Sequence, residues 1–408
     1  MTNPRRIALV TAFPPGGLSL NEYGFHLARS LASQPGVADV VVIADIASAP
    51  VAADAPLHPK FRVCPVWAFN SLATLPRILR ALRREAPDGV IFNLQMASYG
   101  DREVPAALGL LAPLAARLAG YPTGVIAHNI LAGVDLDQTV LKGRRLRQAV
   151  IRAAGHVITR ALLGAHYMTV TLGTYVDLLK ARYPGATGRL HLVPHGTFDT
   201  GDRPWVAQTT RPDRIVTMGK FGTYKRLETL LAAFDILRQD PAHAGTELVI
   251  GGTDHPNTPG YVAALAAARA GDSGVRFAGY VAETDVPAFF EGARLSVFDY
   301  QATTGSSGVL HQSAAYGAVP VFPRIGDFVD LCEDEGLSGL HYEPGDAAGL
   351  ARAMAQVLGD SAGAEAIARA NHRAALGMPM SEVAAFHLLR LAEVGQGRSG
   401  PAAALAAE

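Results

Sequence analysis

The stretch DRIVTMGKFGTYKRLETLLAAF, residues 213–234, joins a strand-like segment to a helix-like segment through a basic loop. Its first residues form an apolar run rich in β-branched side chains, whereas apolar residues from Leu227 to Phe234 recur at helical spacing. Lys220 and Lys225 lie in the loop between them. Cations near a helix N-terminus are unfavourable unless an anion binds close by. The stretch predicts a strand–loop–helix unit whose lysines bind a diphosphate, although exposed surface lysines are the more ordinary interpretation.

The same alternation of short apolar runs and helix-length segments extends over most of the chain. Apolar runs separated by helices are typical of parallel sheets that are covered on both faces. We therefore expect an α/β protein with two doubly wound sheets, joined by the polar, turn-rich segment 198–214. The expected strands are 6–13, 38–46, 88–95, 122–130, 167–173 and 190–196 in the first half, and 213–221, 247–253, 275–280, 295–300 and 319–326 in the second.

Composition excludes several classes of function. Lys and Arg together number 36, as do Asp and Glu, and no RNP, helix-turn-helix or zinc-finger spacing occurs, so we expect no nucleic-acid partner. No apolar segment reaches the roughly 20 residues of a membrane-spanning helix. The closest is residues 104–121, which we expect to form a buried helix with a break near Pro113. Cys64 and Cys332 lie far apart in the sequence, as expected of two buried thiols in a reducing cytoplasm. Residues 142–163 are basic and interleaved with apolar residues, which fits either peripheral membrane contact or a solvated helix face.

A second unusual stretch is ATTGSSGVLHQSAAYG, residues 302–317, where glycines and hydroxyl side chains precede a helical pattern. One interpretation is a flexible turn with an N-cap. The other is an anion site, because glycines let a phosphate approach the unpaired N–H groups of a helix start. In that case the donors would be the amides of Ser306, Ser307, Gly308 and Val309.

Polar groups also follow strands of the first half. Gly16 and Gly17 open the first helix after the first strand, in the sequence FPPGG. His128 and Asn129 follow the strand at 122–130, and NLQMASYGD places Asn93 and Gln95 after another. Ligands of open α/β sheets bind at the carboxyl ends of the strands. Structural roles are as ordinary for these residues as contacts to a ligand.

Several segments together resemble the second domain of a GT-B glycosyltransferase of glycosyltransferase family 4. They are LHLVPHG (190–196), MGKFGTYKRLETLLAAF (218–234), VRFAGYV (275–281) and ATTGSSGVLHQSAAYGAVPVF (302–322). The resemblance covers residues 190–358, and more loosely the first domain through FPPGG and IAHN. It implies two Rossmann-like domains facing across a cleft, a nucleotide-sugar donor and a retaining transfer that needs no metal or other cofactor.

The resemblance also assigns roles to domains and residues. It implies an acceptor-binding domain over 1–204, a donor-binding domain over 205–375, a helix over 376–396 that crosses back to the first domain, and a disordered tail over 397–408. The implied catalytic residues are His128, Lys220 and Lys225, and the acceptor-binding residues are Asn93, Gln95 and Asn129. The implied donor-binding residues are Gly16, Gly17, Gly219, Tyr280, Val281, Thr304, Gly305, Ser306, Ser307, Gly308, Val309 and Gln312.

One departure from the family pattern affects the expected function. The family carries two glutamates, with seven residues between them, at positions that align here with Thr304 and Gln312. Gln312 retains hydrogen-bonding capacity for a ribose without the charge, but Thr304 has neither the reach nor the charge of a carboxylate. The sequence thus predicts a cytoplasmic, retaining, hexosyltransferase-like enzyme acting on a sugar, lipid-linked or small-molecule acceptor. The alternative is a weak or inactive nucleotide-sugar binding protein. A dinucleotide oxidoreductase is disfavoured because no strand is followed by GxGxxG with an acidic residue about 20 positions later.

Overall fold

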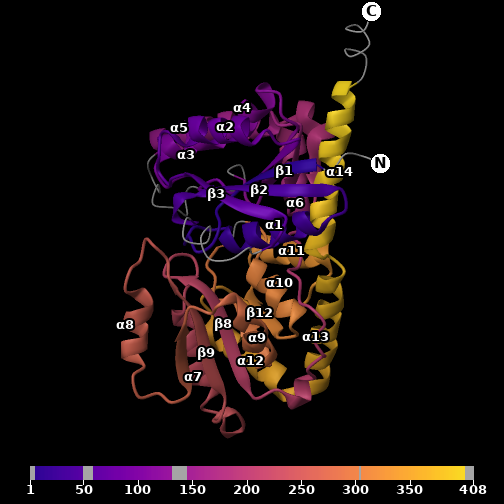
Figure 1. The fold of residues 1–408 in the computed structure, drawn as a ribbon. Coiled ribbons are helices and arrows are strands. Elements are labelled where there is room, and N and C mark those ends of the chain that lie inside the picture. The colour runs from indigo at the N-terminus through magenta and orange to yellow at the C-terminus, as the bar shows by residue number, and fades with distance from the viewer. Residues whose placement is uncertain (1–4, 49–57, 131–144, 303–304, 400–408) are drawn as a thin grey trace, which may run out of the picture. The chain divides into compact units, whose positions relative to one another are not determined.

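The computed structural model describes residues 5–48, 58–130, 145–302 and 305–399, and within the helix that begins at Arg145 the side chains are described from residue 152 onward. Contacts divide the chain into two units, the first comprising residues 1–195 and 380–408 and the second residues 196–379. Each unit contains one parallel sheet with helices on both faces (Figure 1).

The first unit contains a seven-stranded sheet in the order β3-β2-β1-β4-β5-β6-β7. Helices α2, α3, α4 and α5 lie along one side of this sheet, and α1 lies on the other side, where it packs against α14 (Figure 1). The strands are β1 (Arg5–Val10), β2 (Val37–Asp45), β3 (Phe61–Trp67), β4 (Gly89–Leu94), β5 (Thr123–Ala127), β6 (Tyr167–Val170) and β7 (Leu190–Leu192). The helices are α1 (Asn21–Ser33), α2 (Thr74–Glu85), α3 (Glu103–Leu110), α4 (Ala112–Leu118), α5 (Arg145–Leu163), α6 (Gly173–Arg182) and α14 (Met380–Ser399).

The second unit contains a six-stranded sheet in the order β10-β9-β8-β11-β12-β13. Its strands are β8 (Arg214–Phe221), β9 (Glu247–Asp254), β10 (Val275–Gly279), β11 (Leu295–Val297), β12 (Val319–Pro323) and β13 (Leu340–Tyr342). Its helices are α7 (Glu228–Leu237), α8 (Tyr261–Ala268), α9 (Val286–Glu291), α10 (Gly308–Ala315), α11 (Gly326–Glu335), α12 (Ala347–Gly359) and α13 (Ser361–Leu376).

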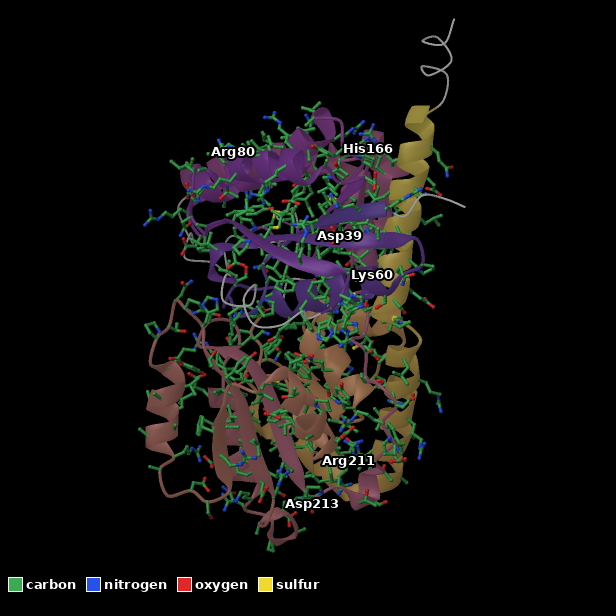
Figure 2. The ribbon with its side chains drawn as sticks, in the orientation of Figure 1. Asp39, Lys60, Arg80, His166, Arg211 and Asp213 are labelled. Atoms are coloured by element: carbon green, nitrogen blue, oxygen red, sulfur yellow. The ribbon has the colours of Figure 1, made fainter. Side chains whose placement is uncertain are left out.

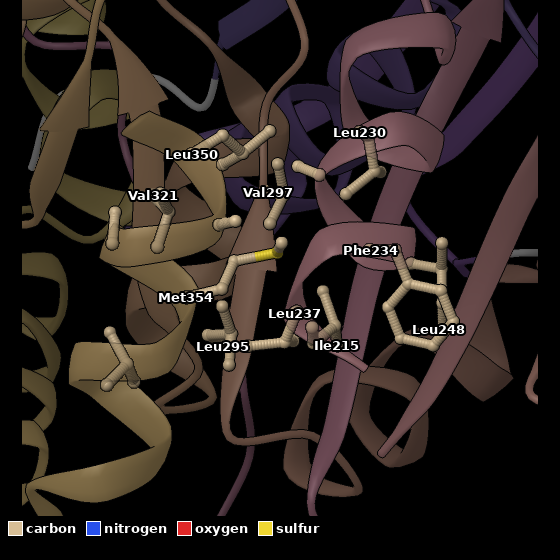
Figure 3. Packing of buried hydrophobic residues seen from close by; sticks show 14 of the residues in the cluster. Ile215, Leu230, Phe234, Leu237, Leu248, Leu295, Val297, Val321, Leu350 and Met354 are labelled. Atoms are coloured by element: carbon tan, nitrogen blue, oxygen red, sulfur yellow. The ribbon is translucent and has the colours of Figure 1, made fainter. Parts of the chain in front are cut away.

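Alternation along the strands of the second unit builds two apolar layers. Ile215 and Leu248 point to the side covered by α7 and α12, where Phe234 and Met354 are fully buried (Figure 3). Their chain neighbours point to the opposite face, toward α9, because successive strand residues alternate. Burying each such side chain contributes about 1.5–3 kcal/mol, so the sheet is held from both faces.

The segment expected as a linker packs closely onto the second unit. Arg211, labelled in Figure 2, is 6% exposed and donates from Nη1 to the carbonyl oxygens of Phe290 and Ala293, at 3.0 and 2.9 Å. Its Nη2 donates to the carbonyl oxygens of Val206 and Tyr316, both at 2.9 Å. Burial lowers the pKa of Arg211 to about 10, so the guanidinium stays charged and ties residues 205–211 to the ends of α9 and α10.

The expected strands are confirmed, and the structure adds two at sheet edges. The first is β3, which contains Pro65, and the second is β13, which has only three residues. The apolar stretch 104–121 was expected as a buried helix with a break near its proline; it does break, into α3 and α4, but Val104 and Leu118 are 61% and 78% exposed. Helix α14 continues to Ser399, so residues 397–399 are helical and not part of a disordered tail. Residues 400–408 lie outside the described part.

Candidate functional site

The strand order of the second unit creates a divergence between two loops. Strand β8 lies between β9 and β11, and the chain leaves β8 toward one edge of the sheet and β11 toward the other. Loops that diverge in this way leave a crevice at the carboxyl ends of the strands, which is where open α/β sheets bind ligands. The two loops are the basic stretch after β8 and the glycine-rich string after β11.

The loop after β8 is a tight turn that is pinned to β11. The Gly222 N–H donates to the Lys225 carbonyl oxygen at 2.8 Å, and the Arg226 N–H donates to the Asp299 carbonyl oxygen at 2.8 Å. Gly222 has φ +110°, and a Cβ at this position would lie 2.2 Å from Thr258 Oγ1. A glycine is therefore required for the turn that presents Lys225 beside the end of β11.

Lys225 lies over aromatic rings at this edge of the sheet. Its Nζ is 4.6 Å from the centroid of the Tyr300 ring and 5.8 Å from that of Tyr224. Burial disfavours the charge, but the interactions with Tyr300 and Tyr224 outweigh it, so the pKa of Lys225 lies above its ordinary value and the ammonium stays charged. A Cβ on Gly219 would lie 3.4 Å from Lys225 Cδ, so this glycine leaves room for the lysine stem.

Lys220 is placed differently from the expectation, and Arg226 is not. Lys220 belongs to β8, which extends to Phe221, and is half-buried, whereas a loop position was expected. The strand runs longer because β8 and β9 stay paired as far as Phe221 and Asp254. Arg226, the residue after Lys225, is exposed.

The glycine-rich string combines a helix cap with unused donors. Ser307 is the N-cap of α10, and its Oγ accepts from the Leu310 N–H at 3.4 Å. No described residue accepts a hydrogen bond from the backbone N–H of Gly308 or Val309. Ser306 Oγ is buried without a described hydrogen-bond partner. The cap interpretation therefore holds for Ser307, while the other groups remain available to a ligand.

Helix α11 fixes the string at both ends. The Gly305 N–H donates to Asp327 Oδ2 at 2.8 Å, so this amide is taken up within the protein and does not serve a phosphate. In the first turn of α10, His311 Nδ1 bonds the Ser307 carbonyl oxygen at 2.8 Å and Nε2 bonds Glu335 Oε2 at 2.6 Å. Burial lowers the pKa of His311, but Glu335 and the Ser307 carbonyl raise it more, so the net shift is upward. No spacing in the sequence indicates these contacts, because they join distant positions.

The other residues that were predicted to bind the donor lie on α10, after β10 or outside the described residues. Gln312 is on α10 and only 6% exposed. Tyr280 is 67% exposed directly after β10, whereas Val281 packs against the apolar layer near Gly251. Thr304 lies outside the described residues.

In the first unit the same kind of divergence, between β1 and β4, contains a buried polar chain. Asn93 Nδ2 donates to Thr11 Oγ1 at 2.9 Å, and His128 Nε2 donates to Asn93 Oδ1 at 2.7 Å. Burial lowers the pKa of His128 to about 3, so the ring is neutral, with its proton on Nε2. Tyr23 packs edge-on against His128 and His195, with centroid distances of 4.4 and 4.7 Å.

These hydrogen bonds change the interpretation of Asn93. It was predicted to contact an acceptor hydroxyl, but it is 1% exposed and its amide is directed at Thr11 and His128. Asn93 therefore orients His128. Asn129 Oδ1 accepts from the Met96 N–H at 2.8 Å and so ties together the loops after β4 and β5, and Gln95 is half-buried beside it. Thr11 and Tyr23 were not identified from the sequence.

The two glycines after β1 have different surroundings. Gly16 is buried, and its N–H donates to the Phe13 carbonyl oxygen at 3.1 Å, so this amide does not face a ligand. A Cβ on Gly16 would lie 2.8 Å from Asp45 Oδ2, which makes the glycine a steric requirement of the turn. Gly17 is exposed, with no atom within 4 Å of a Cβ built there.

No group of three or more His, Cys, Asp or Glu side chains among the described residues is placed to bind a metal ion. None of the helices that the structure describes is both long and apolar enough to cross a membrane.

Comparison with known proteins relates the chain to glycosyltransferases. Residues 212–360 match the family model of glycosyl transferases group 1. A comparison with curated protein sequences found no match. Among solved structures, sucrose-phosphate synthase (tll1590) from Thermosynechococcus elongatus has a TM-score of 0.68 and 18% identity, and the match covers 95% of this chain and 98% of that one.

Two further structures extend the likeness. Anabaena Alr3699/HepE, in complex with UDP-glucose, has a TM-score of 0.63 and 15% identity over 95% of this chain and 100% of that one. WaaG, a glycosyltransferase involved in lipopolysaccharide biosynthesis, has a TM-score of 0.63 and 16% identity over 97% of this chain and 100% of that one. The two parallel sheets and these matches show the fold that the sequence predicted.

Proposed function

We propose that this chain, which has the GT-B fold and whose residues 212–360 match the family model of glycosyl transferases group 1, is a retaining, hexosyltransferase-like enzyme. It would move a sugar from a nucleotide-diphosphate sugar to an acceptor hydroxyl. The observation that carries the proposal is the pairing of Lys220 and Lys225 with the string 305–309 at the loops that diverge after β8 and β11. HepE, whose structure contains UDP-glucose, supports a nucleotide sugar as donor.

The proposed reaction depends on stabilising the negative charge of the leaving nucleoside diphosphate. As the bond between the sugar C1 and the diphosphate oxygen breaks, negative charge grows on the leaving nucleoside diphosphate. Lys225, held charged over Tyr300, and Lys220 would stabilise that charge, together with the N–H groups of Gly308 and Val309. Because these groups supply the positive charge that a metal supplies elsewhere, we propose a reaction that needs neither metal nor cofactor.

The anomeric configuration would be retained because the acceptor attacks the same face of the sugar from which the leaving group departs. The acceptor oxygen bonds to C1 while its proton passes to the departing phosphate oxygen, so the protein need not supply a carboxylate base. With Nε2–H donated to Asn93, His128 would present Nδ1, a hydrogen-bond acceptor. A neutral acceptor suits a sugar hydroxyl better than a phosphate oxygen, because both phosphate and Nδ1 only accept.

We assign donor binding to the second unit and acceptor binding to the first, at the loops that contain Gly17, Gln95 and Asn129. The basic segment 142–163 would give a cytoplasmic enzyme peripheral contact with an anionic membrane. Arg152 and Arg160 of α5 are exposed, and Val157 between them is 64% exposed, which supports this contact. Lys142 and Arg144 lie outside the described residues.

The test has two stages. Isothermal titration calorimetry with UDP, GDP, ADP and dTDP identifies the base, and incubation with the matching sugar nucleotides, with and without EDTA, should release nucleoside diphosphate in both cases. NMR of the product glycoside, once an acceptor is found, should show the anomeric configuration of the donor. Lys220→Met should weaken diphosphate binding at least tenfold, whereas Lys180→Met, at an exposed position on α6, should not. Binding of none of the four nucleotides would refute the proposal.

The alternative is a nucleotide-sugar binding protein with little or no turnover. It is favoured by Gln312, which supplies an uncharged amide where the family carries a glutamate, and which is nearly buried on α10. Tight diphosphate binding without release of nucleoside diphosphate from any donor, over a range of acceptors, would favour this alternative.

A further inference from the structure

The segment TDHPNTPGY, residues 253–261, begins in the last two residues of β9 and contacts the lysine loop. The His255 N–H donates to the Phe221 carbonyl oxygen at 2.7 Å, and Thr258 Oγ1 donates to the same oxygen at 3.2 Å. At its end, the Tyr261 hydroxyl accepts from the Leu227 N–H at 2.9 Å. The segment therefore contacts the basic loop at both its beginning and its end.

His255 lies at the centre of this arrangement. It is half-buried, and its Nδ1 accepts from the Asn257 N–H at 3.2 Å. With Nδ1 used as an acceptor, the neutral ring carries its proton on Nε2 and can donate from that atom. The turn thus fixes which nitrogen is the donor.

The charges around His255 come from the neighbouring loop and strand. Burial lowers the pKa of His255, and the charges of Lys220 and Lys225 lower it further, in agreement with the strand pairing that sets Lys220 opposite Thr253. The carboxylate of Asp254 is taken up elsewhere, because its two oxygens accept from the N–H groups of Gly260 and Val262 at 2.6 and 2.7 Å. Beside two lysines, a third cation would be repelled, whereas a neutral N–H donor is not.

We infer that His255 is a further binding residue for the donor diphosphate, to which its Nε2–H donates a hydrogen bond beside Lys220 and Lys225. The inference rests on the proposed function, since it places the diphosphate at the lysines. Strand pairing supports the placement, because Lys220 of β8 lies opposite Thr253 of β9, two residues before the histidine. A nucleoside monophosphate, which lacks the second phosphate, should depend less on this contact.

Two substitutions separate ligand binding from support of the turn. His255→Asn keeps an oxygen near the position of Nδ1, which can accept from the Asn257 N–H, but removes the distal donor. His255→Gln places an N–H₂ group near the position of Nε2 but loses the local acceptor. His243→Asn, at a half-exposed position before β9, is the matched control.

The measurements are calorimetric titration with the nucleoside diphosphate that binds the wild type and with its monophosphate, and the melting temperature of each variant without ligand. We expect His255→Asn to lose about tenfold in diphosphate affinity, equal to about 1.4 kcal/mol, and less than twofold for the monophosphate. His255→Gln should stay within about threefold of wild type for both ligands, and His243→Asn should match wild type.

Three outcomes overturn the inference. If His255→Asn binds the diphosphate as tightly as wild type, the histidine makes no contact, and the proposed function stands. If the asparagine variant retains affinity while the glutamine variant loses both affinity and melting temperature, the histidine only supports the turn. If the wild type binds no nucleoside diphosphate, the proposed function fails and the inference fails with it.

Discussion

Replacing Gly308 by valine tests whether the string 305–309 receives a phosphate. Gly308 is the first residue of α10, is half-buried, and does not have a positive φ, so a valine fits its backbone conformation. Valine and glycine differ in helix propensity by only a few tenths of a kcal/mol, so the fold should lose little stability. The isopropyl group would cover the N–H groups of Gly308 and Val309. We expect at least a tenfold loss of nucleoside diphosphate affinity, equal to about 1.4 kcal/mol.

Two serine substitutions serve as matched controls for Gly308→Val. Ser307 Oγ accepts from the Leu310 N–H at the long distance of 3.4 Å, so Ser307→Ala should cost roughly 0.5–1 kcal/mol of stability and leave affinity unchanged. For a unit of this size that cost lowers the melting temperature by about 1–4 °C. Ser306 Oγ is buried without a described partner, so Ser306→Ala should leave the free protein as stable as wild type.

The three variants are compared by melting temperature without ligand and by calorimetric titration with the nucleoside diphosphate. The expected pattern is a loss of affinity without loss of stability for Gly308→Val, and the reverse for Ser307→Ala. A folded Gly308→Val protein that binds as tightly as wild type would show that the string only caps α10. The diphosphate would then have to lie elsewhere than between the lysines and this helix.

Three further predictions follow from the same contacts. Lys225→Met should weaken diphosphate binding roughly ten- to a hundredfold, because it removes a charge-assisted hydrogen bond of about 1.5–3 kcal/mol. Arg226→Met, at an exposed position, should change the titrated dissociation constant less than twofold. Equal effects of the two substitutions would refute the assignment of Lys225, and not Arg226, to the diphosphate. Gln312→Leu should lose about fivefold in donor affinity at an unchanged melting temperature, and an unchanged affinity would remove Gln312 from the site. Burial lowers the pKa of His387 to about 3, so its unfolded form binds the extra proton between about pH 3 and 6.5 and stability falls as the pH drops below 6.5. His387→Gln should reduce the loss of unfolding free energy between pH 6.5 and 5 by about 2 kcal/mol, measured by urea unfolding at each pH, and an unaltered loss would contradict this.

The fold could be predicted from the sequence because its signals are local. A buried parallel strand is an apolar run, and the runs that became β1, β2, β4 and the central strands of the second unit are each visible without reference to the rest of the chain. The two strands that were missed are edge strands, where burial is incomplete. In β3 the run is interrupted by Pro65, which an edge position tolerates.

The candidate site was predicted only in part, because its contacts join distant positions. The loops after β8 and β11 could be identified because lysines follow the first strand and glycines follow the second. The contact of His128 with Asn93 spans 35 positions, and that of Gly305 with Asp327 spans 22, so no spacing rule reveals either. The direction of an amide is likewise a property of the folded loop. This is why the N–H of Gly305, a residue expected to bind the donor, instead donates to the Asp327 carboxylate.

The protonation states of Lys225, His255 and His128 constrain the proposed chemistry. Lys225 of the second unit remains charged, because its interactions with Tyr300 and Tyr224 outweigh the effect of its burial. The two histidines are neutral for different reasons, since burial alone acts on His128, while burial and the nearby lysines act on His255. A histidine with a pKa near 3 is a poor general base, because it does not keep the proton that it accepts near neutral pH. His128 is thus suited to orienting a hydroxyl, and a departing phosphate, whose basicity grows as the glycosidic bond breaks, is the better acceptor for the proton. The proposed same-face mechanism requires this division between groups that hold charge and groups that only position.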